Sequence, residues 1–128
     1  MQATVDGSVW RFTTANVATA VIGGGVSLGA QRLVGSNIDA LNFVLSGVTA
    51  TGTYALTTTP PSRFVNLQTG GGSWVGNGAG AATGSITFTT FSSARLAGIF
   101  SFTATPLGGG ATGNKVVTAG TFDVAIAN

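Results

Sequence analysis

The sequence has no cysteine and no histidine among its 128 residues. Without cysteine, the chain has no disulfide framework, no thiol nucleophile and no thiolate metal site. Without histidine, it lacks the usual general base and the commonest metal ligand. These two absences exclude a Ser-His-Asp triad and a Cys-His pair.

Charged residues are also scarce, at 6% of the chain against roughly 25% in an average soluble domain. There is no glutamate, and the isoelectric point near 10.0 rests on a net charge of only +2. The bases are scattered singly, whereas nucleic acids and anionic membranes are bound by clustered Lys and Arg. We therefore expect no nucleic-acid partner. The acids are Asp6, Asp39 and Asp123, and the bases are Arg11, Arg32, Arg63, Arg95 and Lys115.

Long apolar runs are missing as well. No stretch approaches the roughly 18 residues that a membrane-spanning helix needs, so we expect no transmembrane segment. No basic-then-apolar signal peptide opens the chain. Met1 is then either a native start or what remains where an export signal has been removed.

What is present is a series of short alternating apolar and polar runs, separated by glycine-rich turns. This period of two predicts β-strands, and helix-forming residues are too few to predict helices. Asp6-Gly7 is a preferred type I′ hairpin turn. We expect a mobile loop over 76–84, which has almost no side chains to pack, and a second glycine-rich loop over 106–114. The expected strands cover 3–5, 8–12, 17–22, 26–34, 38–45, 53–57, 63–68, 73–75, 85–91, 95–105 and 121–126.

Many short antiparallel strands at this spacing predict an all-β fold, either a β-sandwich or a closed β-barrel. The length fits one domain over residues 1–128. Glycine precedes an aromatic by two residues at Gly52-Thr53-Tyr54, Gly98-Ile99-Phe100 and Gly120-Thr121-Phe122. We interpret these as bulges or close approaches with inward-facing aromatics, the alternative being aromatics that face a ligand. The expected core is Phe43, Tyr54, Phe88, Phe100, Phe102, Phe122 and Val124.

No residues with catalytic, cofactor-binding or metal-binding spacing are found. Lys115 lies in a glycine-rich segment and is interpreted as a solvated loop charge. Asp6 belongs to its turn, Asp39 fits the protection of an edge strand, and Asp123 lies on a polar strand face. No triple-glycine run is followed by Lys-Ser/Thr, and no calcium-loop spacing of acids occurs. We therefore predict no cofactor and no enzymatic activity.

Three residues are candidates for contact with a ligand or partner: Trp74, Trp10 and Arg63. Tryptophan is enriched at interface hot spots. The firm hairpin around Trp10 favours core packing for that residue. Trp74 stands between two glycine-rich stretches, and both packing and exposure stay open for it.

Several segments carry a family pattern. They are Gly84–Thr89, Arg95–Phe102, Thr118–Val124, Asp6-Gly7-Ser8-Val9-Trp10 and Gly52-Thr53-Tyr54. In these segments the chain resembles an uncharacterised family of small exported bacterial lipoprotein-like β domains, a domain of unknown function. The resemblance spans most of the chain and implies an all-β fold and an extracytoplasmic address. Similar proteins are usually anchored through an N-terminal cysteine, which this sequence lacks.

Two functional hypotheses follow, with an enzyme a distant third. The first is an exported structural module, at the cell surface or secreted, that associates with itself or docks into a protein assembly. Few charges leave little repulsion between copies, and unguarded edge strands can pair. Under this hypothesis we expect Thr87→Lys or Thr121→Lys, as a charge at a solvent-facing edge position, to weaken the assembly and leave the fold intact. The second is a small sandwich or barrel that binds an apolar ligand or a glycan in a cavity.

Overall fold

The computed structural model describes residues 1–13 and 17–126, and every regular element in them is a β-strand. Within this part of the chain no helix is long and apolar enough to cross a membrane. The strands are β1 (Gln2–Val5), β2 (Ser8–Arg11), β3 (Val17–Ile22), β4 (Gly25–Val34), β5 (Asn37–Ser46), β6 (Gly52–Ala55), β7 (Arg63–Thr69), β8 (Gly72–Gly76), β9 (Gly84–Phe91), β10 (Arg95–Gly108) and β11 (Lys115–Ala125).

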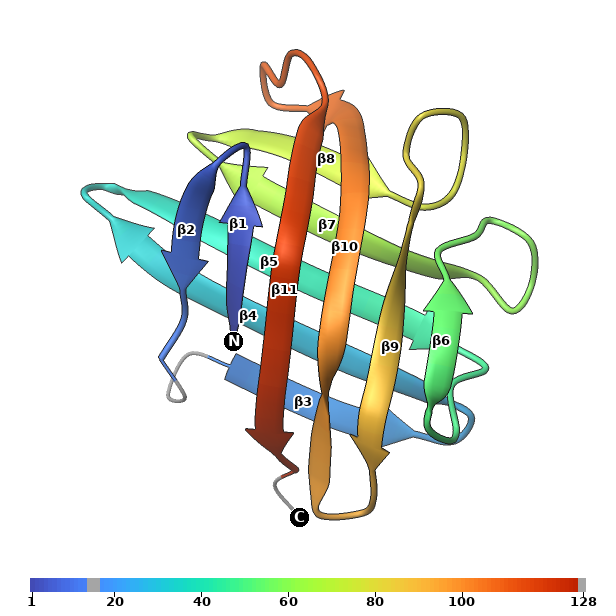
Figure 1. Cartoon of the computed structure of the whole chain (residues 1–128). Helices are drawn as coiled ribbons and strands as arrows, with labels where there is room; N and C mark the ends of the chain where they lie inside the picture. The colour runs from blue at the N-terminus through green and yellow to red at the C-terminus, as the bar shows by residue number, and fades with distance from the viewer. Residues whose placement is uncertain (14–16, 127–128) are drawn as a thin grey trace.

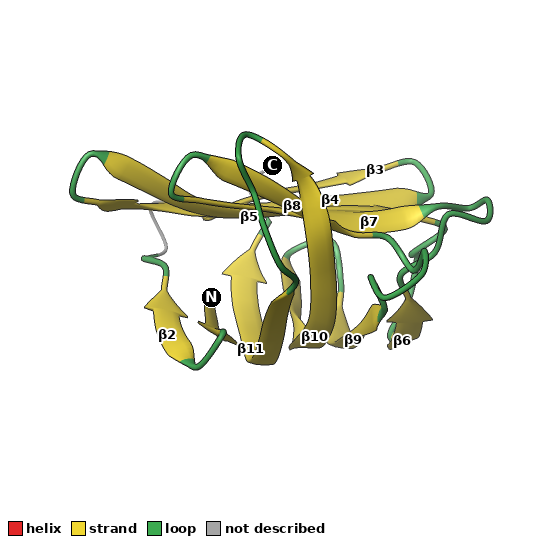
Figure 2. Cartoon of the chain, turned by 90° about the horizontal axis from the view of Figure 1, so that it is seen from above, coloured by secondary structure: helices red, strands yellow, loops and turns green. Residues whose placement is uncertain are grey.

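All eleven strands belong to one antiparallel sheet that curls over itself (Figure 1). One half, the front layer, runs in the order β2-β1-β11-β10-β9-β6. The other half, the back layer, runs in the order β10-β8-β7-β5-β4-β3. The two layers face each other, and their strands cross (Figure 2). The all-β, antiparallel prediction is confirmed, and the sheet is a half-closed barrel because β2 and β3, at its two ends, do not pair.

Strand β10 joins the layers because it pairs with β9 and β11 in its first part and with β8 at its end. Its ladder breaks register opposite β9 between Ala97 and Gly98, and opposite β11 between Phe100 and Phe102. Each such bulge bends a strand and strengthens its twist. The bends allow one continuous strand to leave the front layer and enter the back layer.

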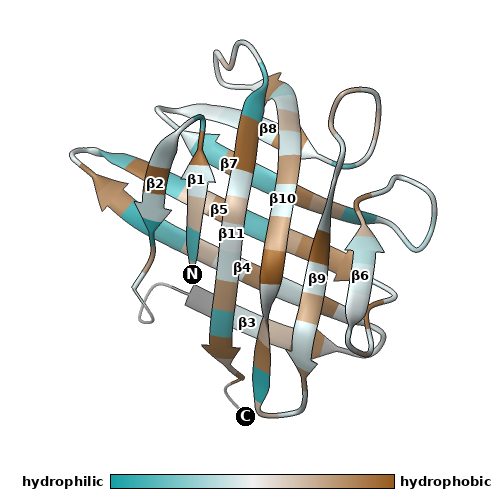
Figure 3. Ribbon diagram, in the orientation of Figure 1, coloured by the Kyte–Doolittle hydropathy of each residue, from teal (hydrophilic) through white to brown (hydrophobic). Residues whose placement is uncertain are grey.

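The core lies between the two layers and is filled mainly by phenylalanine and branched aliphatic residues. Along the long strands, apolar and polar residues alternate, as the brown and pale bands of Figure 3 show. The Phe43 ring meets Phe100 edge-on at 4.9 Å between centroids, and Phe88 meets Phe122 at 5.3 Å. Every residue of the expected core is buried except Tyr54, which is half-buried and packs against the rest.

The glycines of the recurring Gly-x-aromatic pattern leave room for rings. Gly98 pairs with Phe122, and Phe100 pairs with Gly120 on the neighbouring strand. A Cβ on Gly98 would lie 2.9 Å from Cζ of Phe122. The aromatic rings therefore occupy the space above the opposite glycine, which is the close approach that the sequence predicts for Phe100 and Phe122.

The Asp6-Gly7 turn is confirmed as type I′, since both residues have positive φ, at 48° and 84°. Two expected strand ends differ from the structure. Strand β10 continues as far as Gly108, into the start of the expected 106–114 loop, and β11 begins at Lys115 rather than at Thr121. A bulge at Ala119, whose φ is 50°, interrupts the alternation of apolar and polar residues in β11. The alternating pattern therefore does not predict the first half of this strand.

The glycine-rich segment after β8 also departs from the expectation that it has almost nothing to pack. The Gly78 amide donates to the Ala82 carbonyl at 2.6 Å, and Ala82 is completely buried. A Cβ on Gly78 would overlap the carbonyl group of Leu56. The segment thus packs closely on the chain that follows β6.

The edge positions are corrected by the topology. Thr87 lies on β9, between β6 and β10, and Thr121 lies on β11, between β1 and β10. Both strands are interior, so neither residue borders a free edge. Among the described strands, β2, β3 and β6 have a neighbour on one side only.

Candidate functional site

Asp39 is the buried acid of the molecule, with 5% of its surface exposed. It points inward because alternate residues of a strand face the same side, and Leu41 and Phe43, two and four residues further along β5, are buried. Arg32 stands directly opposite it on β4. Both Nε and Nη2 of Arg32 donate to its Oδ2, at 3.1 and 3.0 Å. The Thr69 hydroxyl donates to its Oδ1 at 2.7 Å. The edge-strand interpretation of Asp39 is wrong, since β5 lies between β4 and β7.

Trp10 belongs to this same cluster. Its indole is only 5% exposed, and the Arg32 guanidinium carbon lies 5.2 Å from its ring centroid. The cation–π contact joins β2 of the front layer to β4 of the back layer. The cluster therefore ties the two layers together, and Trp10 is a core residue with no face free for a partner.

Trp74 is buried as well, at 6% exposure. Its Nε1 donates to the Gly113 carbonyl at 2.8 Å, and the Lys115 ammonium lies 4.9 Å from its ring centroid. Lys115 also pairs with Asp6 at 3.2 Å, while the Val116 amide donates to Asp6 at 2.8 Å. Lys115 is thus half-buried at the start of β11 rather than a solvated loop charge.

Arg63 is half-buried and packs against β6. Its guanidinium carbon lies 5.4 Å from the Tyr54 ring centroid, and its Nε donates to the Ala55 carbonyl at 3.0 Å. These contacts fasten β7 to β6. The three contact candidates therefore lie apart, each in a different cluster.

The third acid lies at the surface, on the outer face of the front layer. Arg95 Nε and Nη2 donate to the two carboxylate oxygens of Asp123, at 2.6 and 2.5 Å. These hydrogen bonds hold the pKa of Asp123 below its usual value and raise the pKa of Arg95. Each of the three carboxylates is therefore neutralised by its own base. Within the described residues, no buried side-chain nitrogen or oxygen lacks a hydrogen-bond partner.

The outer face of the back layer is the most unusual surface. Among the described residues of β4, β5, β7 and β8, this face carries no charge, because Arg32, Asp39 and Arg63 all lie on the inner side. Leu33 is 77% exposed on it, Ile38 48% and Val44 41%. We call it the neutral face. It consists of Ser27, Gly29, Gln31, Leu33, Ile38, Ala40, Asn42, Val44, Ser46, Phe64, Asn66, Gln68, Ser73 and Val75.

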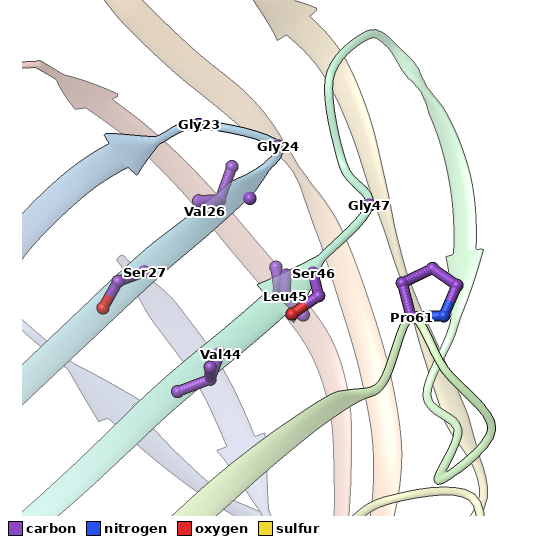
Figure 4. A pocket seen from close by; sticks show the side chains of 10 residues that line it. Gly23, Gly24, Val26, Ser27, Val44, Leu45, Ser46, Gly47 and Pro61 are labelled. Carbon is purple, nitrogen blue, oxygen red and sulfur yellow. The ribbon is translucent and has the colours of Figure 1, made fainter.

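A hollow of about 560 Å³ borders this face, between the β3–β4 turn and Pro61 (Figure 4). Glycines 23, 24, 25 and 47 make up much of its lining, together with Val44 and Leu45. A Cβ on Gly47 would lie 2.7 Å from Cγ of Pro61, so this glycine lets the proline ring pack closely. The lining offers two serine hydroxyls, of Ser27 and Ser46, and no charged group.

Sequence reasoning missed the neutral face. The available signal is parity: with Leu41, Phe43 and Leu45 on one side of a strand, Asn42 and Val44 must point to the other. What parity cannot supply is which strands share a layer. That requires the register of β4, β5, β7 and β8, which depends on long-range pairing.

A family model described as "Domain of unknown function (DUF6252)" matches residues 1–124. The chain belongs to this family. Comparison of this DUF6252 domain with curated proteins and with solved structures gives no match. The expectation of an uncharacterised domain is thereby confirmed.

Proposed function

We propose that this DUF6252 domain is a non-enzymatic, exported surface module that works by associating with copies of itself or by docking into a larger assembly. The observation that carries the proposal is the neutral face. On this face β4 and β5 expose Leu33, Ile38 and Val44, and the neighbouring Arg32 and Asp39 point to the inner side of the sheet. Exposed apolar side chains on a face without charge suit a protein–protein contact.

The size of the face suits a contact. Four neighbouring strands about 4.8 Å apart, each about eight residues long on average at about 3.3 Å per residue, make a face of roughly 500 Å². Stable interfaces bury about 800 Å² per partner, and transient ones bury less. One neutral face is thus near the lower end of what a specific contact uses.

The distribution of charge supports the same proposal. Arg32, Arg95 and Lys115 are each engaged by a carboxylate of their own chain. Little charge is left to repel a second copy or to attract a nucleic acid. The exported, cell-surface address rests on the resemblance of the strand motifs, such as Gly84–Thr89, to exported β domains.

The test is a charge placed on the neutral face. Val44→Lys puts an ammonium group on β5, and burying it in a contact would cost several kcal/mol. We expect the association constant, measured by analytical ultracentrifugation, to fall at least about tenfold. Thr118→Lys, which adds the same charge to an interior strand of the front layer, serves as the control. Equal association of both variants would contradict the proposal.

A second candidate function is the binding of a small apolar ligand in the hollow beside Pro61. Its volume of about 560 Å³ falls within the range of about 300–1,000 Å³ of ligand sites. A domain that stays monomeric and takes up an apolar fluorescent probe would favour this candidate. Displacement of the probe by Ser27→Trp would place it in the hollow.

A further inference from the structure

The three free edges of the sheet differ in how well they are protected. Strands β2 and β6 have four residues each. Arg11 stands on β2, and the Arg63 guanidinium donates to the Ala55 carbonyl at the end of β6. Charged groups at an edge discourage pairing with another chain. Both of these edges are therefore short and guarded.

Strand β3 is different, because its six residues, VATAVI, include no charge and no proline. It pairs with β4 along its whole length, from Val17 opposite Ala30 to Ile22 opposite Gly25. In the described part of the chain, no backbone hydrogen bond is made on its other side. Figure 1 shows β3 as the border of the back layer. Its free edge is a template for a further strand.

The sequence of β3 indicates which strand fits. Residues 17–21 read Val-Ala-Thr-Ala-Val, which is the same in both directions about Thr19. When two such strands pair antiparallel about a two-fold axis at Thr19, residue 17 meets residue 21 of the second copy, and residue 18 meets residue 20. Threonine then stands opposite threonine, a favourable cross-strand pair.

The position of Thr19 supports this register. Thr19 faces the inside of the layer, since its hydroxyl donates to the Ala125 carbonyl at 3.4 Å. In an antiparallel pair, residues opposite each other lie on the same face, so the inner faces of both copies coincide in this register. A shift by one residue would bring the inner face of one copy to the outer face of the other.

We propose that two copies of the chain join edge to edge through β3, antiparallel and in the register centred on Thr19. The inference rests on the proposed function and names its partner as a second copy. The two back layers then form one continuous sheet, and their neutral faces combine into a surface of roughly 1,000 Å². An area of that size reaches what a stable further contact requires.

Single cysteines can test the register directly, because the chain has no cysteine of its own. In the proposed register, residue 19 faces its own copy with Cβ atoms about 5 Å apart, close enough for a disulfide after a small adjustment. Residue 20 faces residue 18, so its own copy is about 7–8 Å away, beyond disulfide reach. Thr19→Cys should therefore cross-link and Ala20→Cys should not.

The experiment oxidises each variant mildly and measures the disulfide-linked dimer on a non-reducing gel. Thr118→Cys, on the front layer, is the control and measures cross-linking by random collision between copies. We expect Thr19→Cys to cross-link at least about tenfold faster than Thr118→Cys, because the two thiols are held side by side in the dimer at a high effective concentration. The double variant Ala18→Cys/Ala20→Cys should also cross-link, which covers the case in which Thr19→Cys does not fold.

Cross-linking of Thr19→Cys at the rate of Thr118→Cys, or of Ala20→Cys as fast as Thr19→Cys, would overturn the proposed register. If the wild-type mass is then still multimeric and sensitive to Val44→Lys, the proposed function stands without the β3 contact. If the wild-type domain is monomeric, both proposals fail.

Discussion

At the scale of residues, each of the three acids of this domain forms an ion pair with a base of the same chain. Arg32 and Asp39 lie opposite each other on β4 and β5, and the Thr69 hydroxyl donates a further hydrogen bond to the carboxylate. Lys115 spans Asp6 and the face of Trp74. A buried carboxylate is stable only when it is paired and hydrogen-bonded. The contacts of Asp39 meet that condition, and the Thr69 and Lys115 contacts connect strands that are far apart in the sequence.

The buried pair should matter much more for stability than the exposed one. Asp39→Ala leaves the half-buried Arg32 guanidinium without its partner, and we expect it to lower the free energy of unfolding by about 2–3 kcal/mol. Asp123→Ala removes an exposed pair and should have a much smaller effect. Urea unfolding followed by tryptophan fluorescence measures both. Equal losses would show that Asp39 is not held as described.

The exposed pair has a separate signature in pH. Hydrogen bonds from Arg95 lower the pKa of Asp123 in the folded state below the ordinary value of 3.8. A lowered carboxyl pKa stabilises the fold above the ordinary pKa, and this contribution is lost as the pH falls through the lowered value. Carbon-detected NMR titration should place the Asp123 midpoint below 3.8, and Arg95→Gln should return it toward that value. An unchanged midpoint in Arg95→Gln would contradict the pairing.

At the scale of elements, the packing of β10 against β11 in the front layer depends on glycines that stand opposite aromatic rings. Strands β10 and β11 alternate them, so Gly98 lies across from Phe122 and Gly120 across from Phe100. The rings fill the space of the missing side chains, and the glycines let two strands and a ring pack closely. This arrangement explains why a sequence rich in glycine still builds a dense core.

A methyl group at one of these glycines tests that arrangement. Gly120→Ala brings a Cβ into the Phe100 ring and within 2.6 Å of the Phe100 carbonyl oxygen, and overpacking of this kind costs about 1–3 kcal/mol. Gly108→Ala, at the end of β10, meets no atom within 4 Å and is the matched control. Thermal unfolding should show a lower midpoint for Gly120→Ala and an unchanged or slightly higher one for Gly108→Ala. An unchanged midpoint for Gly120→Ala would mean that the ring is free to move aside.

The strands themselves were largely predictable, because alternation and turn residues act locally. The Asp6-Gly7 turn and the inward side of β5 follow from such local rules. The sequence predicts too short a strand for β11, because the bulge at Ala119 places two exposed residues in succession and breaks the alternation. The interior positions of Thr87 and Thr121, and the paired state of Asp39, depend on strand order. Strand order is a property of long-range pairing that local patterns do not contain.

At the scale of the whole molecule, the curled sheet separates its surfaces by charge. The front layer carries Arg11 and the Arg95–Asp123 pair on its outer side, whereas the neutral face of the back layer carries none among its described residues. Both the face and the unguarded edge of β3 belong to the same layer. The back layer is therefore the side through which we expect copies to associate.

The native mass in solution tests this expectation most directly. Light scattering from the wild-type domain, measured across protein concentrations at low and high salt, should give at least twice the monomer mass of 12.6 kDa at micromolar concentration. Salt should not reduce the mass, because the contact contains no charge to screen. A mass of 12.6 kDa at every concentration, up to the high micromolar range, would contradict the account.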